Sequence, residues 1–477
     1  MTDKKTPYFF ALLPILVLIA LLAYNVFLYG DNSLGGANQL VLLFAAATAS
    51  IVGIKFGSKW KTILDGISKS ISSTTPSLII LLLIGALAGT WLISGIVPAM
   101  IYYGLQILNP KIFLFATAII TAIVSLATGS SWSTIATIGI ALLVIGQALG
   151  FPTGLIGGAI ISGAYFGDKM SPLSDTTNLA PAMAGTDLFT HIRYMMYTTI
   201  PSFVITLIIF LVIGFTYNTS DEQDINGLLS AISNSFNVSG WLFFVPVLVI
   251  ILITKKTPAI PALLAGTLLG GIFAIIFQPD VVMSITSAES LTFSSAYMAV
   301  INAMGGEISI TTENEMINNL LSTGGMYGML NTVWLIICAM IFGGAMESTG
   351  LIRRVAEPII SYAQSTGSLI ATTAGTCVFF NITASDQYLA IVVPGRMYAD
   401  TYKEKGLAPE NLSRTLEDSG TVTSVLIPWN TCGATQSAVL GVATFAYLPF
   451  CFFNLISPLM TIAYGYLGIK IKKLENK

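Results

Sequence analysis

Long apolar runs, separated by short polar stretches, recur along almost the whole chain. A helix needs about 20 mostly apolar residues to cross the hydrocarbon core of a bilayer. The runs predict membrane-spanning helices near residues 8–29, 37–54, 76–103, 111–149, 194–217, 241–253, 258–277, 326–349, 368–393 and 445–467. Two further stretches, 153–185 and 412–442, are apolar but interrupted by polar residues. The pattern predicts an all-α polytopic membrane protein.

Composition supports the same class. Of 477 residues, 54% are hydrophobic and 9% are charged, whereas a soluble domain carries about 25% charged residues. The net charge of −2 offers no basic patch for a nucleic-acid partner. The four cysteines have no paired spacing and His191 is the single histidine, which excludes a disulfide framework, a zinc site and a clustered enzyme centre. We expect a protein that is not an enzyme and has no cofactor.

Basic residues in short loops predict the orientation, because Lys and Arg favour the cytoplasmic side. Those that can be cytoplasmic together are Lys4, Lys5, Lys55, Lys59, Lys61, Lys69, Lys255, Lys256, Arg353, Arg354, Lys470, Lys472 and Lys473. Two longer loops, placed outside, carry Asp221, Glu222, Asp224, Asp280, Glu289, Glu307, Glu313 and Glu315. One loop, with Arg396, Lys403, Lys405 and Arg414, also falls outside and breaks the trend. Both termini are expected in the cytoplasm.

This orientation constrains the first interrupted stretch. If both ends of 153–190 are cytoplasmic, the segment enters and leaves on one side, as a re-entrant hairpin or a pair of short spans does. Each half of the chain then has about five spans, a re-entrant hairpin and a broken helix. The second half is inserted upside down relative to the first.

Motifs that recur at a nearly constant distance support two inverted repeats. At an offset of 255 or 256 residues, the matches are Gly89 with Gly344, Ser94 with Thr349, Gly95 with Gly350, Thr128 with Thr383 and Pro172 with Pro428. Transporters built from inverted repeats carry Gly- or Pro-interrupted segments in corresponding positions. We predict a first repeat in 1–217, an outside linker in 218–238 and a second repeat in 239–477.

Four segments are too polar for their place in the apolar pattern: 128–134, 167–181, 381–387 and 417–436. Irregular backbone at membrane depth is tolerated where it is buried in protein or lines a cavity. Its free carbonyls, with nearby Ser, Thr, Asn and Asp oxygens, suit an alkali cation. A single Ser or Thr commonly bonds back to its own helix, so the prediction rests on the clusters. The predicted binding residues are Thr128, Ser130, Ser131, Ser174, Asp175, Thr176, Thr177, Asn178, Thr383, Ser385, Asp386, Asn430, Thr431 and Thr435.

Carboxylates inside these regions are a sharper signal, because burying them is costly. Candidates for proton coupling are Asp175, Asp386 and Glu347, followed by Asp168 and Asp418. A carboxyl group in a low-dielectric cavity holds a proton or ligates a cation, and that mutual exclusion is a minimal mechanism of cation/proton exchange. We predict Na⁺ at Asp175, Thr176, Asn178, Ser385 and Asp386. The structural alternatives are ion pairs of Asp168 with Lys169 and of Glu347 with Arg353 or Arg354.

The run GDKMSPLSDTTNLAP at 167–181, with TGSSWST at 128–134, resembles the signature of the NhaC family of bacterial sodium/proton antiporters. The similarity covers most of the chain, including 428–436. It implies a bacterial inner-membrane antiporter of the ion-transporter superfamily, with inverted repeats, hairpins, elevator-type movement and a homodimeric assembly. Segments 174–178 and 430–431 are also similar to the Ser-Asn-Thr motifs of sodium/dicarboxylate transporters. Asp175 replaces the middle Asn there, which favours a cation and proton site.

The predicted function is exchange of Na⁺ for H⁺ across the membrane by alternating access. The alternative is a Na⁺-coupled carrier of a small organic anion or amino acid, since some similar proteins exchange malate and protons for lactate and sodium. Such a carrier needs a basic or helix-N-terminal clamp for a carboxylate, and Lys169 is the best-placed basic residue. A channel would show a continuous polar face on several helices, whereas polarity here lies in paired, interrupted segments.

Overall fold

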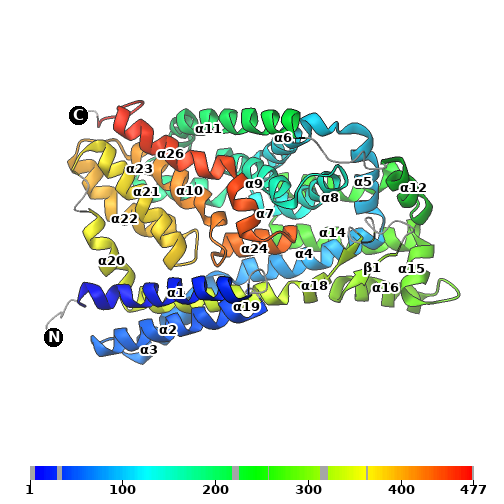
Figure 1. Cartoon of the computed structure of the whole chain (residues 1–477), viewed down its shortest axis with the longest axis horizontal. Helices are drawn as coiled ribbons and strands as arrows, with labels where there is room; N and C mark the ends of the chain where they lie inside the picture. The colour runs from blue at the N-terminus through cyan, green and yellow to red at the C-terminus, as the bar shows by residue number, and fades with distance from the viewer. Residues whose placement is uncertain are drawn as a thin grey trace.

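Most residues of the computed structural model lie in helices (Figure 1). The structure describes residues 6–29, 35–217, 225–255, 257–311, 318, 321–360 and 364–474. Within them, eight helices are long and apolar enough to cross a membrane, or up to ten if each of two bent pairs is one span. The predicted all-α polytopic class is confirmed. Part of the predicted linker (218–224) lies outside the described residues, as do Lys4, Lys5, Asp221, Glu222, Asp224, Lys256, Glu313 and Glu315.

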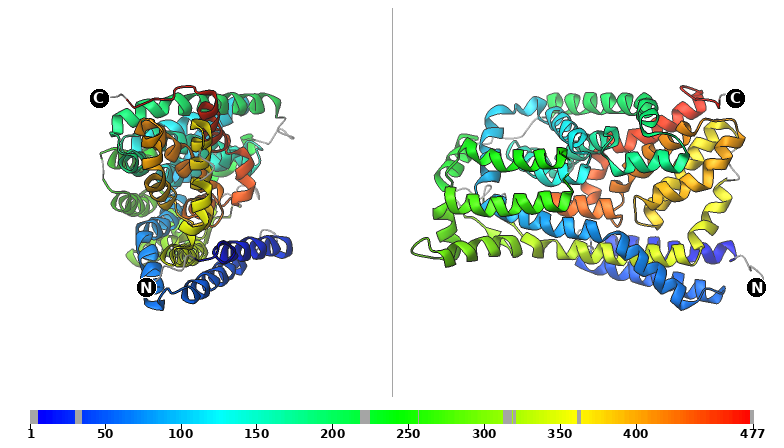
Figure 2. Two further views of the ribbon diagram at one scale, coloured as in Figure 1. Left: turned by 90° about the vertical axis from the view of Figure 1, so that its left-hand side faces the viewer. Right: turned by 180° about the vertical axis from the view of Figure 1, so that it is seen from behind.

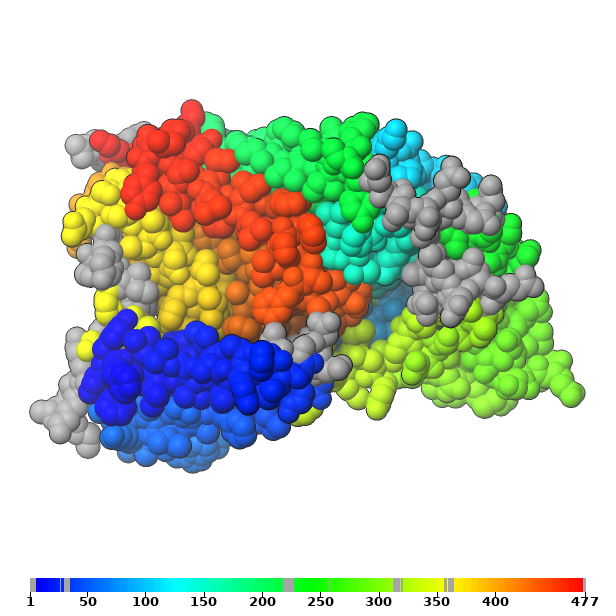
Figure 3. Space-filling model, in the orientation of Figure 1, coloured from blue at the N-terminus to red at the C-terminus, as the bar shows by residue number. Residues whose placement is uncertain are grey.

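The helices form two layers, which lie one above the other in Figure 1. The lower layer contains α1 (Tyr8–Tyr29), α2 (Ala37–Lys55), α3 (Trp60–Ser73), α4 (Thr75–Ile93), α14 (Ala259–Phe277), α15 (Pro279–Thr286), α16 (Phe293–Gly305), α18 (Gly325–Gly328) and α19 (Leu330–Ser348). Next to it lie α12 (Ile225–Ser235), α13 (Phe244–Thr254), which packs on α14, and a two-stranded ribbon of β1 (Ile308–Ser309) and β2 (Ser322–Thr323). Helices α1–α3 stand out along one edge (Figures 2 and 3).

The upper layer contains the polar segments. Its first part consists of α6 (Pro110–Thr128), α7 (Ser131–Thr134), η2 (Ile135–Gly139), α8 (Ile140–Ala148), α9 (Thr153–Met170), α10 (Asp175–Ala184) and α11 (Leu188–Thr216). Its second part consists of α21 (Thr366–Thr383), α22 (Leu389–Glu404), α23 (Pro409–Leu416), η4 (Glu417–Thr421), η5 (Ser424–Leu426), α24 (Thr431–Leu440), α25 (Thr444–Tyr447), η6 (Leu448–Phe450) and α26 (Phe452–Leu467). Two helices at opposite ends, α5 (Ile96–Ile107) and α20 (Leu351–Ile360), connect the layers (Figure 1).

Helices α6 and α9 approach each other to backbone contact. A Cβ atom on Gly163 would lie 2.1 Å from the Ala118 carbonyl oxygen, and one on Gly167 would lie 2.2 Å from that of Ala122. Small residues permit such close packing between helices in a membrane, where burial away from water contributes little. The contact fixes the end of α9 beside the end of α6, where two of the polar segments meet.

Helices α6, α7 and α8 form a hairpin. The Phe113 ring, near the start of α6, stacks on Phe151, just after α8, with centroids 5.6 Å apart. Phe151 in turn stacks on Tyr217, at the end of α11, at 5.4 Å. Both arms of the hairpin therefore open at the same end of the molecule. The single crossing predicted for 111–149 is corrected to a hairpin.

The stretch 153–185 is a broken crossing and not the hairpin or pair of short spans predicted for it. Helix α9 begins at the open end of the first hairpin, beside Phe151, and α10 ends near the start of α11. The 29 residues of α11 lead back to Tyr217 at that open end, so α9 and α10 together run in the opposite direction. With 10 residues, α10 is about 15 Å long and covers half of a bilayer core. The chain breaks at 171–174.

The second half also contains a hairpin. Lys405, after α22, donates a hydrogen bond to the carbonyl of Gln364, just before α21 (2.7 Å), so α21 and α22 also form a hairpin. A Cβ on Gly154, at the start of α9, would lie 2.2 Å from the Ala446 carbonyl oxygen in α25. The open end of the first hairpin is thus near the start of the α25–α26 pair. The open end of the second is near the end of that pair, where Leu407 bridges Lys473.

Candidate functional site

Each hairpin tip meets the helix break of its own half. Gly129, at the first tip, has a left-handed backbone (φ 70°) and lies against Leu173 in the 171–174 break. Ser385, at the second tip, is also left-handed (φ 59°), and its carbonyl accepts a hydrogen bond from the Thr431 N–H (3.0 Å) at the start of α24. These contacts bring four interrupted helix ends to the middle of the molecule.

A cavity of about 630 Å³ lies where the hairpin tips face the lower layer. The lower layer contributes residues at the α3–α4 junction, within 73–80, and residues 257–260 at the start of α14, and Ile253 of α13 lies beside them. The upper layer contributes three aspartates, Asp168, Asp175 and Asp386, together with serine and threonine hydroxyls. The described residues of the lining include no Lys, Arg or His. The site is therefore acidic and suits a cation.

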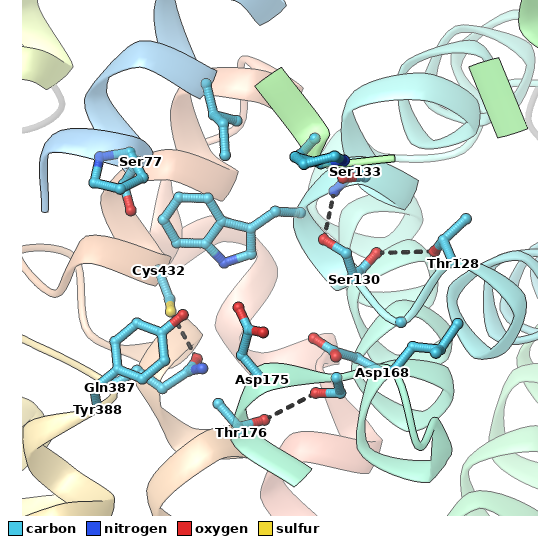
Figure 4. Close-up of a pocket in the computed structure, with 18 of the residues that line it drawn as sticks. Ser77, Thr128, Ser130, Ser133, Asp168, Asp175, Thr176, Gln387, Tyr388 and Cys432 are labelled. Atoms are coloured by element: carbon cyan, nitrogen blue, oxygen red, sulfur yellow. Dashed lines mark hydrogen bonds between the residues drawn. The ribbon is translucent and has the colours of Figure 1, made fainter. Parts of the chain in front are cut away.

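The three aspartates differ in their surroundings. Asp168 is 8% exposed, and its Oδ2 accepts hydrogen bonds from the Ser131 N–H (3.0 Å) and hydroxyl (2.7 Å). Asp386 is 6% exposed and accepts the Leu389 N–H at 2.9 Å. Asp175, the first residue of α10, is exposed to the cavity, where the positive end of the helix dipole favours a negative charge. Figure 4 shows the Asp168 and Asp175 side chains directed into the same space.

Half of the predicted site residues line this one cavity. They are Thr128, Ser130, Asp168, Ser174, Asp175, Thr176, Asp386 and Thr431. They come from both hairpin tips and from both helix breaks, although up to about three hundred residues separate them along the chain. Residues from all four polar segments that the sequence analysis identified therefore line one cavity or lie next to it.

The other predicted residues lie behind the cavity or away from it. The Ser131 hydroxyl donates a hydrogen bond to Asp168, and the Asn430 amide donates one to the Asn381 side chain (3.1 Å). Two threonine hydroxyls bond to backbone carbonyls: Thr177 to that of Lys169 (3.0 Å) and Thr383 to that of Phe379 (2.8 Å). The hydroxyls of Ser385 and Thr435 are buried without a hydrogen-bond partner among the described residues. Glu347, at the end of α19, is exposed and outside the lining. No ion pair joins Glu347 to a described residue.

The Na⁺ site predicted at Asp175, Thr176, Asn178, Ser385 and Asp386 is not assembled as one cage. Asn178 donates to the carbonyls of Ser174 (2.7 Å) and Pro172 (3.0 Å), and neither Asn178 nor Ser385 lines the cavity. The Thr176 hydroxyl is committed to hydrogen bonds with Glu417 and Ser174. Asp175 and Asp386 remain as cavity carboxylates, joined by Asp168.

The stretch 163–469, from within α9 to just beyond α26, matches the model of the Na⁺/H⁺ antiporter family. The chain belongs to the Na⁺/H⁺ antiporter family. It is 38% identical to the Na⁺/H⁺ antiporter NhaC of Alkalihalophilus pseudofirmus over 99% of this chain and 98% of that protein. It is equally identical to the malate-2H⁺/Na⁺-lactate antiporter of Bacillus subtilis, over 100% and 98%. The arginine/ornithine antiporter ArcD of Halobacterium salinarum is 34% identical, over 98% and 94%.

This family member has three residues, one in the cavity lining and two buried behind it, that are not among the predicted binding residues. Gln387 accepts hydrogen bonds at Oε1 from the Ser424 hydroxyl and the Cys432 thiol, both at 2.9 Å, so its amide orientation is fixed. Lys169 forms a fully buried ion pair with Asp418, which replaces the predicted pairing with Asp168. Glu417 is fully buried beside this pair. The sequence signal for all three was their place inside polar interruptions of apolar runs.

Hydrogen bonds in the two halves of this antiporter-family chain correspond at an offset of 256 residues. Ser131 bonds to Asp168 in the first half, and Gln387 bonds to Ser424 in the second. Ser125 donates to the Ala164 carbonyl (2.6 Å), and Asn381 donates to the Gly420 carbonyl (2.7 Å). The element starts correspond in the same way: Thr153 and Pro409, Asp175 and Thr431, Leu188 and Thr444.

Proposed function

We propose that this protein exchanges Na⁺ for H⁺ across the bacterial inner membrane by alternating access. The observation that carries the proposal is the acidic cavity between the layers, where three aspartates and several hydroxyls meet at interrupted helix ends and no described basic side chain neutralises them. Hard oxygen ligands of this kind suit an alkali cation. The names of its relatives supply the ions, Na⁺ and H⁺.

Competition at the carboxylates couples the two ions. A protonated aspartate cannot ligate Na⁺ effectively, and an aspartate that ligates Na⁺ resists protonation. Three negative charges in one cavity repel each other, so the site is most stable when cations or protons compensate them. The empty, fully ionised site is the costly state to carry across the membrane. The exchange of one cation for another therefore has the lower barrier.

The layered arrangement supports an elevator-type movement. The cavity has one wall on the lower layer and one on the hairpin tips, so sliding the upper layer along the lower one exposes the site to either end. Helices α5 and α20 connect the layers at opposite ends and would serve as hinged arms. We further propose that residues 1–217 and 239–477 are inverted repeats, as the matched elements and hydrogen bonds favour.

The test is transport by the purified protein in liposomes that contain a pH-sensitive dye. Addition of Na⁺ outside should acidify the exterior and alkalinise the interior, because H⁺ leaves as Na⁺ enters. Asp175→Asn and Asp386→Asn should each reduce this flux to that of empty liposomes, because each removes a charge from the cavity. Asp280→Asn, an exposed aspartate in the first turn of α15, is the matched control and should leave the flux unchanged.

The size of the cavity favours a second candidate, a Na⁺-coupled carrier of a small organic anion or amino acid. About 630 Å³ is within the range of small-molecule pockets, about 300–1,000 Å³, and far larger than one cation needs. The names of the malate/lactate and arginine/ornithine relatives are of this kind. In the same liposomes, proton movement that requires malate, lactate or an amino acid in addition to Na⁺ would favour this candidate over simple exchange.

A further inference from the structure

A fourth carboxyl group lies behind the cavity, fully buried. Glu417 begins η4, a π-helical turn that follows α23, and is 0% exposed. Its Oε1 accepts a hydrogen bond from the Thr176 hydroxyl at 3.1 Å. Among the described residues, neither its Oε2 nor the Thr421 hydroxyl, one turn further on, has a hydrogen-bond partner. A π-helical turn of this kind commonly marks a functional position.

The buried basic residue beside Glu417 already forms an ion pair with the adjacent acid. Lys169 pairs with Asp418, and the Thr198 and Ser457 hydroxyls also donate to Asp418, at 2.8 and 3.3 Å. Asp418 is therefore fully satisfied as an anion. Glu417 forms no ion pair with any described residue. Two buried acids share one buried base, and an unpaired buried carboxylate is far less stable than its protonated form.

The surroundings do not supply another base. The charges that act on Glu417 are those of Lys169 and Asp168, both on α9, and Asp168 repels a negative charge there. The other titratable groups on the elements packed against η4 are Asp175 on α10, Cys377 on α21, Glu410 and Arg414 on α23, Tyr464 and Tyr466 on α26, and Arg396, Tyr398, Asp400, Tyr402, Lys403 and Glu404 on α22. Of the α22 residues, Arg396, Asp400, Lys403 and Glu404 are exposed, whereas Glu417 is fully buried. Arg414 donates to the Lys470 carbonyl and stacks on Tyr194, away from Glu417.

A short chain of hydroxyls joins Glu417 to the cavity. The Thr176 hydroxyl that contacts Glu417 also lies 3.2 Å from the Ser174 hydroxyl, and both residues line the cavity. Figure 4 shows this hydrogen bond, at the start of α10 below Asp175. Hydroxyl groups both donate and accept, so they can pass a proton along such a chain. Glu417 is thus buried from solvent, and two hydrogen-bonded hydroxyl groups connect it to the cavity.

We propose that Glu417 is a proton-carrying site of this transporter, separate from the aspartates that hold the cation. The inference rests on the proposed Na⁺/H⁺ exchange and assigns one of its protons. When Na⁺ enters the cavity, its charge stabilises the Glu417 carboxylate, and the proton leaves. Glu417 gives its proton to the Thr176 oxygen, Thr176 passes its own proton to Ser174, and Ser174 passes its own to a cavity water. The two hydroxyls are restored, and one H⁺ is released for the Na⁺ that is bound.

The experiment is a proton count on the full-length protein in detergent. Weakly buffered protein with a pH indicator receives NaCl, or choline chloride as a blank, and bound ²²Na⁺ is measured in parallel. Wild type should bind Na⁺ and release protons. Glu417→Gln should still bind Na⁺ but release about one proton fewer per chain, since one titrating site has been removed. Glu410→Gln, which removes a buried acid on α23 away from the cavity, should release as many protons as wild type.

Each other outcome contradicts a different statement. Equal proton release by Glu417→Gln and wild type would overturn the assignment of Glu417, while Na⁺/H⁺ exchange would stand. Loss of Na⁺ binding by well-folded Glu417→Gln would make it part of the cation site and would also overturn the assignment. A wild type that binds no Na⁺ would overturn the proposed function and this inference together. If Glu417→Gln does not fold, Glu417→Asp keeps a carboxyl group, and Na⁺ must then remove a protonated-carboxyl infrared band whose position differs from that of wild type.

Discussion

At the scale of the residue, the contact between Lys169 and Asp418 is the most consequential one in the upper layer. Both side chains are 0% exposed, and they join α9 of the first half to η4 of the second, 249 residues apart. Buried ion pairs contribute little net stability compared with apolar residues, but loss of one partner leaves an uncompensated charge. The pair therefore ties the two halves together beside the cavity.

We predict an asymmetry between single and double substitution of this pair. Lys169→Met should reduce the free energy of unfolding by about 3–5 kcal/mol, because it leaves Asp418 charged and unpaired. Lys169→Met combined with Asp418→Asn should recover most of this loss, since the Asn oxygen still accepts a hydrogen bond from one of the two hydroxyls, Thr198 or Ser457, and the other hydroxyl can accept one from the Asn NH2 group. Thermal unfolding of the purified variants in detergent is the measurement. A double variant that is less stable than Lys169→Met would contradict this account.

The sequence alone could identify residues that line the cavity, but it could not identify the contacts that buried charged residues make. Asp175 and Asp386 stand out because each is a carboxylate inside a polar interruption of an apolar run. The partner of Lys169 could not be found this way, because Asp168 is adjacent in the sequence and Asp418 is near only in the folded chain. Glu417 cannot be identified from the sequence for the same reason, since its burial depends on α10, α21 and α26, which pack against η4 only in the folded chain.

At the scale of the element, the hairpin tips depend on two residues with left-handed backbones. Gly129 and Ser385 are 256 residues apart and turn the chain at equivalent points. A Cβ on Gly129 would lie 2.5 Å from the Cβ of Leu173, so glycine is also required there by the closeness of the helix break. Ser385 tolerates a side chain because its tip meets Thr431 through the backbone.

Gly129→Ala should therefore damage the cation site as well as the fold. A left-handed alanine costs about 1–2 kcal/mol, and the clash with Leu173 adds about 1–3 kcal/mol of overpacking. Displacement of the 171–174 break moves Asp175, so the Na⁺ concentration for half-maximal transport should rise. Gly185→Ala is the matched control: it has the same kind of backbone (φ +84°), and its added Cβ would meet nothing within 4 Å. Equal effects of both substitutions on Na⁺ dependence would contradict the proposed geometry.

The hairpins were also the elements that hydropathy could not resolve. A hairpin whose two arms are both apolar has the same pattern as one long span, so 111–149 and 368–393 were each predicted as a crossing. The stretch that follows each hairpin, 153–185 or 412–442, is the one that crosses, whereas hydropathy predicts that it enters and leaves on one side. Each exchange of a crossing with a hairpin moves only the loop between the two to the other side. In the first half this loop, 150–152, carries no charge, whereas in the second half it carries Lys403 and Lys405.

At the scale of the whole molecule, this correction removes the exception to the charge rule. Lys403 and Lys405 end a hairpin whose mouth lies beside Gln364 and beside the C-terminal segment, where Leu407 bridges Lys473. The N-terminal region reaches the same end, since Thr6 accepts a hydrogen bond from Arg354 and Lys55 lies over Phe10. Basic residues thus gather at one end of the molecule, which favours a cytoplasmic position for that end.

The orientation can be tested with two single cysteines. The four native cysteines are buried, so the unsubstituted protein should react little with a membrane-impermeant maleimide. Glu289 and Lys403 are both exposed but lie at opposite ends. In intact cells, Glu289→Cys should be labelled and Lys403→Cys should not, whereas both should be labelled after permeabilisation. Labelling of Lys403→Cys in intact cells would return this loop to the outside, as the uncorrected spans require. Such labelling has two explanations: the second hairpin is a crossing after all, or the whole chain is inserted in the opposite orientation. Glu289→Cys distinguishes them, because only the opposite orientation would protect this cysteine in intact cells.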